Sequence, residues 1–236
     1  MTRSSLAIAL LVLVGCAERV VPPTDLPRVS IPDAMPQNRM APDQALASSC
    51  NARPERAFGS RVSAGAVDIA LLDRAILYRS NRARCRMGLD PLAPDPRLRE
   101  TATVHSADMV RLGFFDHVSP VPGRTTMGDR LKAGGVAYRT AAENLATAQR
   151  LEMADGQPVY PLGQGRCAYS FTPKGKRVPI RTYDSLAENL VTRWLESPGH
   201  RRNLLNADYT RHGASAVIDP SGRICDSISA TQLFAG

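Results

Sequence analysis

The sequence lacks an apolar run long enough to cross a membrane as a helix, and it contains few aromatic residues. Its longest uninterrupted apolar segment, residues 6–14, is far shorter than the ~20 residues that a membrane-spanning helix requires. Aromatic residues make up 5% of the chain, whereas 43% of the residues are hydrophobic and 22% are charged. These proportions are typical of a globular protein that can build a core.

Signatures of common enzymes and metal-binding modules are missing as well. The sequence has no Gly-x-Ser-x-Gly segment, no His-Glu-x-x-His segment and no Cys-x-x-Cys pair. It also has no basic patch interleaved with aromatic residues, so no nucleic-acid partner is expected. The net charge of +8 therefore has two interpretations. The positive side chains either form a solvated face or attract anionic lipopolysaccharide or peptidoglycan.

The N-terminus resembles a bacterial lipoprotein signal. Arg3 precedes the apolar run, which ends in Leu-Val-Gly-Cys at residues 13–16. This pattern predicts a signal peptide over residues 1–15 and lipidation of Cys16, which would anchor an exported protein to a membrane. Ala17 and Glu18, in place of an aspartate after the cysteine, favour the periplasmic side of the outer membrane. The alternative is an ordinary signal peptide that happens to contain a cysteine.

Residues 16–62 are rich in proline and have no sustained apolar period, so they are expected to form an extended tether. The folded domain is expected to occupy residues 63–236.

The four remaining cysteines, Cys50, Cys85, Cys167 and Cys225, are an even number in a chain predicted to be exported. An oxidising compartment favours two disulfides, for which three connectivities exist. The preferred pairing joins Cys50 to Cys85, which would fix the end of the tether to the first helix, and Cys167 to Cys225.

Apolar periodicity and capping residues predict three helices and a late pair of strands. The first helix runs from about Ile69 to the stop at Gly88, and the second begins at Asp95 and ends at Gly113. The third opens at Asp184, and a short helical turn that carries a histidine follows it. Residues 213–218 and 224–234 read as strands. Helices with strands gathered late predict an α+β fold.

Three blocks of the sequence resemble bacterial CAP domains, the superfamily of cysteine-rich secretory, antigen 5 and pathogenesis-related 1 proteins, also called SCP-like. They are Phe-Phe-Asp-His-Val-Ser-Pro at residues 114–120, Ala-Glu-Asn-Leu-Ala at 142–146, and a segment at 194–206 that begins with Trp-Leu-Glu-Ser-Pro-Gly-His. The resemblance implies a three-layer α-β-α sandwich. Residues 149–183 depart from the family pattern and are interpreted as an inserted loop.

The resemblance also implies a cleft in which His117, Glu143 and His200 converge. The family's second acid falls on Asn189 here, and Glu188 is the nearest acidic residue. Two imidazoles and a carboxylate would suit Zn²⁺ or another divalent metal, so His117, His200 and Glu143 are the candidate metal ligands. The competing interpretation is a buried polar network that only fixes the geometry of loops.

The other histidines and the large aromatic residues are assigned structural roles. His105 lies on the apolar face of the second helix and is expected in the core, whereas His212 is expected in an exposed loop. Trp194 and the pair Phe114 and Phe115 are expected to be core residues.

Two functions follow from the resemblance. The first is a non-enzymatic envelope module that binds a lipid, a cell-wall component or another small ligand in the cleft. The second is a metal-dependent hydrolase or protease that uses the same residues, with an open position for water.

Overall fold

The computed structural model describes residues 49–236 except 66 and 164. The predicted signal peptide, Cys16 and most of the predicted tether lie outside the described residues, so lipidation stays a prediction. None of the helices in the described part is both long and apolar enough to cross a membrane.

A four-stranded sheet forms the middle layer. Its strand order is β1 (Ala93–Pro94), β5 (Arg211–Asp219), β6 (Ser227–Ala235) and β2 (Ala141–Gln149). The three long strands pair antiparallel over nine residues each, and β1 adds a short parallel edge beside β5.

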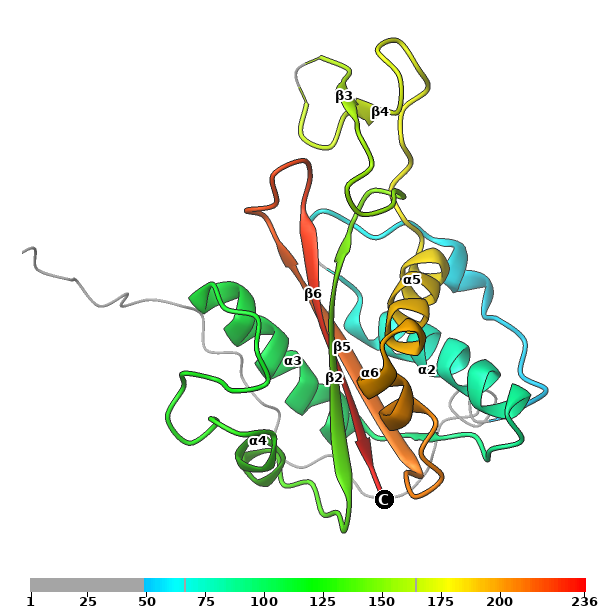
Figure 1. The fold of residues 1–236 in the computed structure, drawn as a ribbon, viewed down its shortest axis with the longest axis vertical. Helices are drawn as coiled ribbons and strands as arrows, with labels where there is room; N and C mark the ends of the chain where they lie inside the picture. The colour runs from blue at the N-terminus through cyan, green and yellow to red at the C-terminus, as the bar shows by residue number, and fades with distance from the viewer. Residues whose placement is uncertain (1–48, 66, 164) are drawn as a thin grey trace, which may run out of the picture. The chain divides into compact units, whose positions relative to one another are not determined.

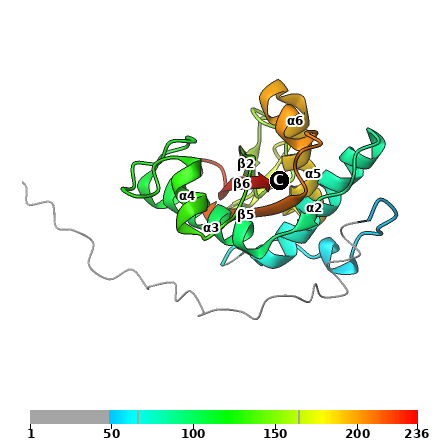
Figure 2. The same ribbon diagram turned by 90° about the horizontal axis from the view of Figure 1, so that it is seen from below.

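Helices cover both faces of this sheet (Figure 1, Figure 2). One face packs against α3 (Pro96–Leu112), beside which lies α4 (Met127–Ala133). The other face packs against α2 (Ile69–Arg86), α5 (Tyr183–Glu196) and α6 (Pro198–Leu204). The predicted α+β class and three-layer α-β-α sandwich are therefore confirmed.

Alternation along the strands divides the apolar core between the two faces. On β6, Phe234 belongs to the larger cluster with α2 and α5, whereas its neighbour Leu233 packs with Leu98 of α3 and Leu131 of α4. Successive side chains of a strand point to opposite faces, so one strand supplies both cores. Trp194 is fully buried in the larger cluster, as predicted.

Capping residues explain where the helices begin and end. Asp95 accepts hydrogen bonds from the first backbone N–H groups of α3, and Gly113 ends that helix in the left-handed conformation (φ 68°). Such a φ favours glycine because a Cβ atom would be strained there. Thr182 and Ser185 form a reciprocal cap at the start of α5, which begins at Tyr183, one residue before the Asp184 start that the sequence predicted.

Gly213 allows α3 to lie directly on β5. A Cβ atom at this position would stand 2.2 Å from the backbone nitrogen of Arg99 and 2.5 Å from the carbonyl carbon of Leu98. Any side chain here would push the helix off the sheet. The close contact also lets Thr103 of α3 donate a hydrogen bond to the side chain of Ser215 on β5, at 2.9 Å.

The packed region begins earlier than the predicted boundary at residue 63. Phe58, in a 3-10 turn (Arg56–Gly59), and Val62 are already buried in the larger apolar cluster. Of the long strands of the sheet and the helices that cover it, β2 and α4 were not predicted from the sequence, and neither were the two-residue strands β1, β3 and β4.

Both predicted disulfides are present. Cys50 is joined to Cys85 with a Cα–Cα distance of 5.7 Å, and Cys167 to Cys225 with 4.7 Å. The first ties the N-terminal segment to the last turn of α2. The second joins Cys167, within the segment that was predicted as an insertion, to Cys225, just before β6.

That segment, residues 149–183, holds the hairpin of β3 (Tyr160–Pro161) and β4 (Tyr169–Ser170), which projects beyond the end of the sheet (Figure 1). It has an apolar cluster of its own. The buried members of this cluster are Leu151, Met153, Cys167, Val178 and Cys225. Beside it, the buried Asp226 accepts hydrogen bonds from Arg150 and Arg166, which fixes the base of the hairpin to β6.

Candidate functional site

Glu143 on β2 is the centre of the predicted cleft, but its carboxylate is buried and fully engaged. Its side chain is 2% exposed. Arg130 of α4 donates to both oxygens, at 2.8 and 2.7 Å, and the Nδ1–H of His117 donates to Oε1 at 2.9 Å. A buried carboxylate needs such partners, because an unpaired charge in the interior is costly.

Arg130 connects this carboxylate to the loop that carries His117. Its guanidinium also donates to the backbone carbonyls of His117, Arg124 and Thr125, and its side chain is 1% exposed. One buried cation therefore sets both the position of Glu143 and the path of the loop between α3 and α4. Sequence reasoning did not identify this residue.

His117 and His200 stand beside each other at the surface of the site. Their ring centroids are 6.3 Å apart, and the side chain of His117 is 53% exposed. His200 lies in the first turn of α6, which begins at Pro198 directly after α5 ends. The structure thus brings together three of the four residues that were predicted for the cleft.

Buried amides hold α6 against the sheet. The side-chain nitrogen of Asn144 donates to the carbonyl of His200, and Asn203 of α6 donates to the side chain of Asn144 and to the carbonyl of Glu143. Asn144 is fully buried and also donates to Gln232 on the neighbouring strand β6. These bonds fix the distance between His200 and the strand that carries Glu143.

The amide chain continues into the core to His212. The side-chain nitrogen of Gln232 donates to Nε2 of His212 and to Ser80 of α2, and both partners are fully buried. Because Nε2 accepts, the ring proton lies on Nδ1, which is 3.6 Å from Asp73. The prediction of His212 as an exposed loop residue was wrong. This residue is the second of strand β5, where it pairs with Phe234 of β6, and its side chain is fully buried.

His105 is fully buried, as expected for a core histidine, but it is not remote from the site. Its Nε2 lies 3.1 Å from the carbonyl of Asp116 and 3.9 Å from the carboxylate of Glu143. Phe114 packs near its ring, whereas Phe115 is 50% exposed and therefore not the core residue that was predicted.

Glu188 does not join the cleft. Its carboxylate pairs with Arg79 of α2 at 3.3 Å, and it lines a groove between α2 and α5. Asn189, at the family's acid position, accepts a hydrogen bond from Arg193, which also forms a bidentate pair with Asp155 in the segment of residues 149–183. Adjacent residues on a helix point about 100° apart, so Glu188 cannot replace an acid at position 189.

The residues do not fit a three-ligand metal site. Within the described part of the chain, only Cys167, Cys225 and Asp226 bring three potential ligand atoms within 4.8 Å of one another, and both of these cysteines are in a disulfide. Glu143 gives its oxygens to Arg130 and His117. Because Glu143 is bonded to Nδ1 of His117, Nε2 of the same ring points away from the carboxylate. Acids orient metal-binding histidines in this way.

The environment moves the pKa values of the two cleft histidines in opposite directions. The hydrogen bond to Glu143 raises the pKa of His117 above its ordinary value, although burial opposes it. Burial, followed by the nearby charge of His117, lowers the pKa of His200. For Glu143, burial acts to raise the pKa, but the hydrogen bond from His117 and the charge of Arg130 outweigh it, so the pKa is lowered.

We expect His117 to bind its proton more tightly than His200. In an NMR titration of the ring Cε1–H signals, His200 should lose its proton at lower pH than His117, and Glu143→Gln should bring the pKa of His117 down because the charged acceptor is gone. Glu188→Gln removes an acid outside the cleft and should move neither signal. Deprotonation of His117 at or below the pH of His200 would contradict this electrostatic description.

The chain is similar to a known protein family and to two known bacterial proteins. The model of the cysteine-rich secretory protein family, CAP, matches residues 77–232. The uncharacterized protein YkwD of Bacillus subtilis (strain 168) is 29% identical over 198 residues, which are 84% of this chain and 59% of that protein. The uncharacterized membrane protein YlbC of the same organism is 32% identical over 141 residues, 60% of this chain and 30% of that protein. The chain therefore spans less than two thirds of either relative.

Two solved structures are similar at a lower level. An extracellular protein containing a SCP domain from Bacillus anthracis str. Ames has 27% identity and a TM-score of 0.47 over 71% of this chain and 41% of that chain. An outer surface protein from Borrelia burgdorferi has 16% identity and a TM-score of 0.43 over 68% of this chain and 88% of that chain.

Proposed function

The chain belongs to the cysteine-rich secretory protein (CAP) family, and from this premise we propose that it is an exported, non-enzymatic module that binds a carboxylate-bearing cell-wall fragment between His117 and His200. One observation carries the proposal. Both oxygens of Glu143 are bonded to Arg130 and one is also bonded to His117, whose half-exposed imidazole has a raised pKa and lies beside a second imidazole.

A protonated His117 is a donor for an anionic ligand. Hydrogen bonds in which the donor or the acceptor is charged are roughly twice as strong as those between neutral groups. His200, whose pKa is lowered, stays neutral and can donate or accept at the same ligand. The charge of Glu143 is balanced by the buried Arg130, so it repels an incoming carboxylate less than a free acid would.

The metal-dependent hydrolase is the weaker alternative. Glu143 would have to release Arg130 to become a ligand or a general base, and this would leave a buried cation without its partner.

Export is supported by the two disulfides, since such bonds persist in oxidising compartments. Anchoring through a lipidated Cys16, on the periplasmic side of the outer membrane, is proposed from the sequence at residues 13–16. It would hold the binding module close to an envelope layer.

Calorimetric titration with muropeptides, the soluble fragments of digested peptidoglycan, tests the proposed ligand. Binding is expected, and His117→Gln and His200→Gln should each weaken it about tenfold, as for the loss of a charge-assisted hydrogen bond. Lys132→Gln, at an exposed position of α4, is the control and should leave the affinity unchanged.

The pH dependence separates the two functions. Muropeptide binding should weaken as the pH rises through the pKa of His117, because the imidazolium loses its charge. Zn²⁺ binding would strengthen over the same range, because only neutral imidazole is a ligand. Zn²⁺ binding that needs both histidines, together with no muropeptide binding, would refute the proposal in favour of the metal site.

A further inference from the structure

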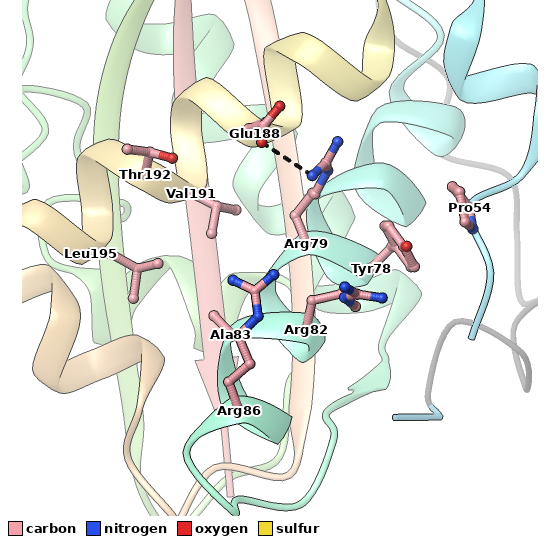
Figure 3. Close-up of a pocket in the computed structure, with 10 residues that line it drawn as sticks. All are labelled: Pro54, Tyr78, Arg79, Arg82, Ala83, Arg86, Glu188, Val191, Thr192 and Leu195. Atoms are coloured by element: carbon pink, nitrogen blue, oxygen red, sulfur yellow. Dashed lines mark hydrogen bonds and ion pairs between the residues drawn. The ribbon is translucent and has the colours of Figure 1, made fainter. Parts of the chain in front are cut away.

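A second candidate site lies on the helical face of the molecule, in the groove between α2 and α5 (Figure 3). The groove has a volume of about 160 Å³. A cavity needs only about 15 Å³, measured in the same way, to hold one water molecule, so the groove is many times larger than a single water site. Its lining residues are Pro54, Tyr78, Arg79, Arg82, Ala83, Arg86, Glu188, Val191, Thr192 and Leu195. None of the residues of the His117 cleft is among them.

Three arginines of α2 line the groove because of their spacing. Arg79, Arg82 and Arg86 follow one another at steps of three and four residues, which places them on one face of the helix. In Figure 3 the side chain of Arg86 extends along the groove toward Val191, and Arg82 extends toward Pro54. The disulfide between Cys50 and Cys85 ties the segment that carries Pro54 to the end of α2, so this wall is covalently fixed.

The charges in the groove are not balanced. Arg79 is neutralised by Asp184, at 2.6 Å, and by Glu188, at 3.3 Å. Arg82 and Arg86 are exposed, and among the described residues no acid lies within ion-pair distance of either one. Two guanidinium groups therefore remain for a ligand anion, and Glu188, the one acid in the lining, is already paired.

The floor of the groove is apolar. Ala83 of α2 faces Val191 and Leu195 of α5, and the ring of Tyr78 stands at one wall. A hydrated free anion gains nothing from such a floor, whereas an ester that carries an organic group can cover it. Guanidinium groups match the oxygens of phosphate in a bidentate geometry.

We propose that this groove binds a phosphate monoester, with Arg82 and Arg86 on the phosphate and the organic group on Val191 and Leu195. The site is independent of the cleft at His117, so His117→Gln should leave it unchanged. It gives the protein a second, anion-selective ligand position, between α2 and α5.

Calorimetry with hexyl phosphate and with inorganic phosphate tests both parts of the proposal. Hexyl phosphate is expected to bind at least fivefold more tightly than inorganic phosphate, since only the ester reaches the apolar floor. Equal affinity would overturn the assignment of a monoester and leave a simple anion site. No binding of hexyl phosphate would overturn the site altogether.

Variants locate the binding. The double variant Arg82→Gln and Arg86→Gln should weaken hexyl phosphate binding at least tenfold, whereas Glu188→Gln should strengthen it several-fold. Lys132→Gln with Arg139→Gln removes the same charge from exposed positions outside the groove and should change the affinity less than twofold. An equal loss in this control would show general attraction to a basic protein and would overturn the groove as the site.

Discussion

Replacing Arg130 with methionine is expected to destabilise the protein by about 3–5 kcal/mol, because it leaves the carboxylate of Glu143 buried without a cation. Both side chains are nearly inaccessible, at 1% and 2% exposure. The variant also leaves the carbonyls of His117, Arg124 and Thr125 without a donor. Urea unfolding at neutral pH measures the loss as a change in the free energy of unfolding.

Three companion measurements identify the cause. Arg130→Lys keeps the charge but not the planar fork and should lose less than the methionine variant. Adding Glu143→Met to Arg130→Met should recover part of the stability, since a buried pair replaced by apolar groups costs less than a broken pair. The deficit of Arg130→Met should shrink in acid, where Glu143 can be protonated. A pH-independent deficit with no recovery in the double variant would mean that only packing was lost.

The helices could be predicted because the residues that begin and end them act locally. The disulfides could be predicted because four cysteines allow only three pairings. Asp95 and Gly113 mark the ends of α3 by their own backbone preferences, and both positions agree with the structure. The cysteine pairing was one choice among three, made from where the helices lie, and the structure has the same pairing.

Strand β2 and helix α4 were missed because their local signals are weak. Strand β2 has the sequence AAENLATAQ, in which alanine and polar residues give little β-propensity, and its pairing with β6 alone makes it a strand. Helix α4 has only seven residues. His212 was misplaced because an arginine and a glycine flank it, yet the glycine is there to admit α3 and the histidine points into the core.

The candidate site was found through family resemblance and not through periodicity. That resemblance located His117, Glu143 and His200 but gave no reason to choose Arg130 or Gln232. Arg130 acts through contacts to backbone carbonyls and to a residue on another layer, and such contacts leave no mark in the sequence. Gln232 is important because its register with Asn144 on β2 joins the two amides, a relation that exists only in the sheet.

The buried residues Asp73 and His212 are expected to make the free energy of unfolding depend strongly on pH. Burial raises the pKa of Asp73 to about 7, and burial lowers the pKa of His212 to about 3. Both side chains are therefore held neutral in the folded protein near pH 5. Asp73 Oδ1 accepts the backbone N–H of Ala214 at 2.7 Å, so its position is fixed whether or not it is charged.

Asp73→Asn is expected to be more stable than the natural protein at pH 8, by up to about 4 kcal/mol, and to show little difference near pH 4. The folded pKa of Asp73 lies above its unfolded value of 3.8, so its contribution is fully present below about pH 4 and is lost as the pH rises through about 7. Asparagine keeps an oxygen for Ala214 and carries no charge to bury. Urea unfolding of both proteins across this pH range measures the difference, and Asp208→Asn, at an exposed acid, should show almost none. If the natural protein is the more stable one at pH 8, the carboxylate of Asp73 is stabilised in its charged form, and Arg99, whose guanidinium lies 3.8 Å away, would be its partner.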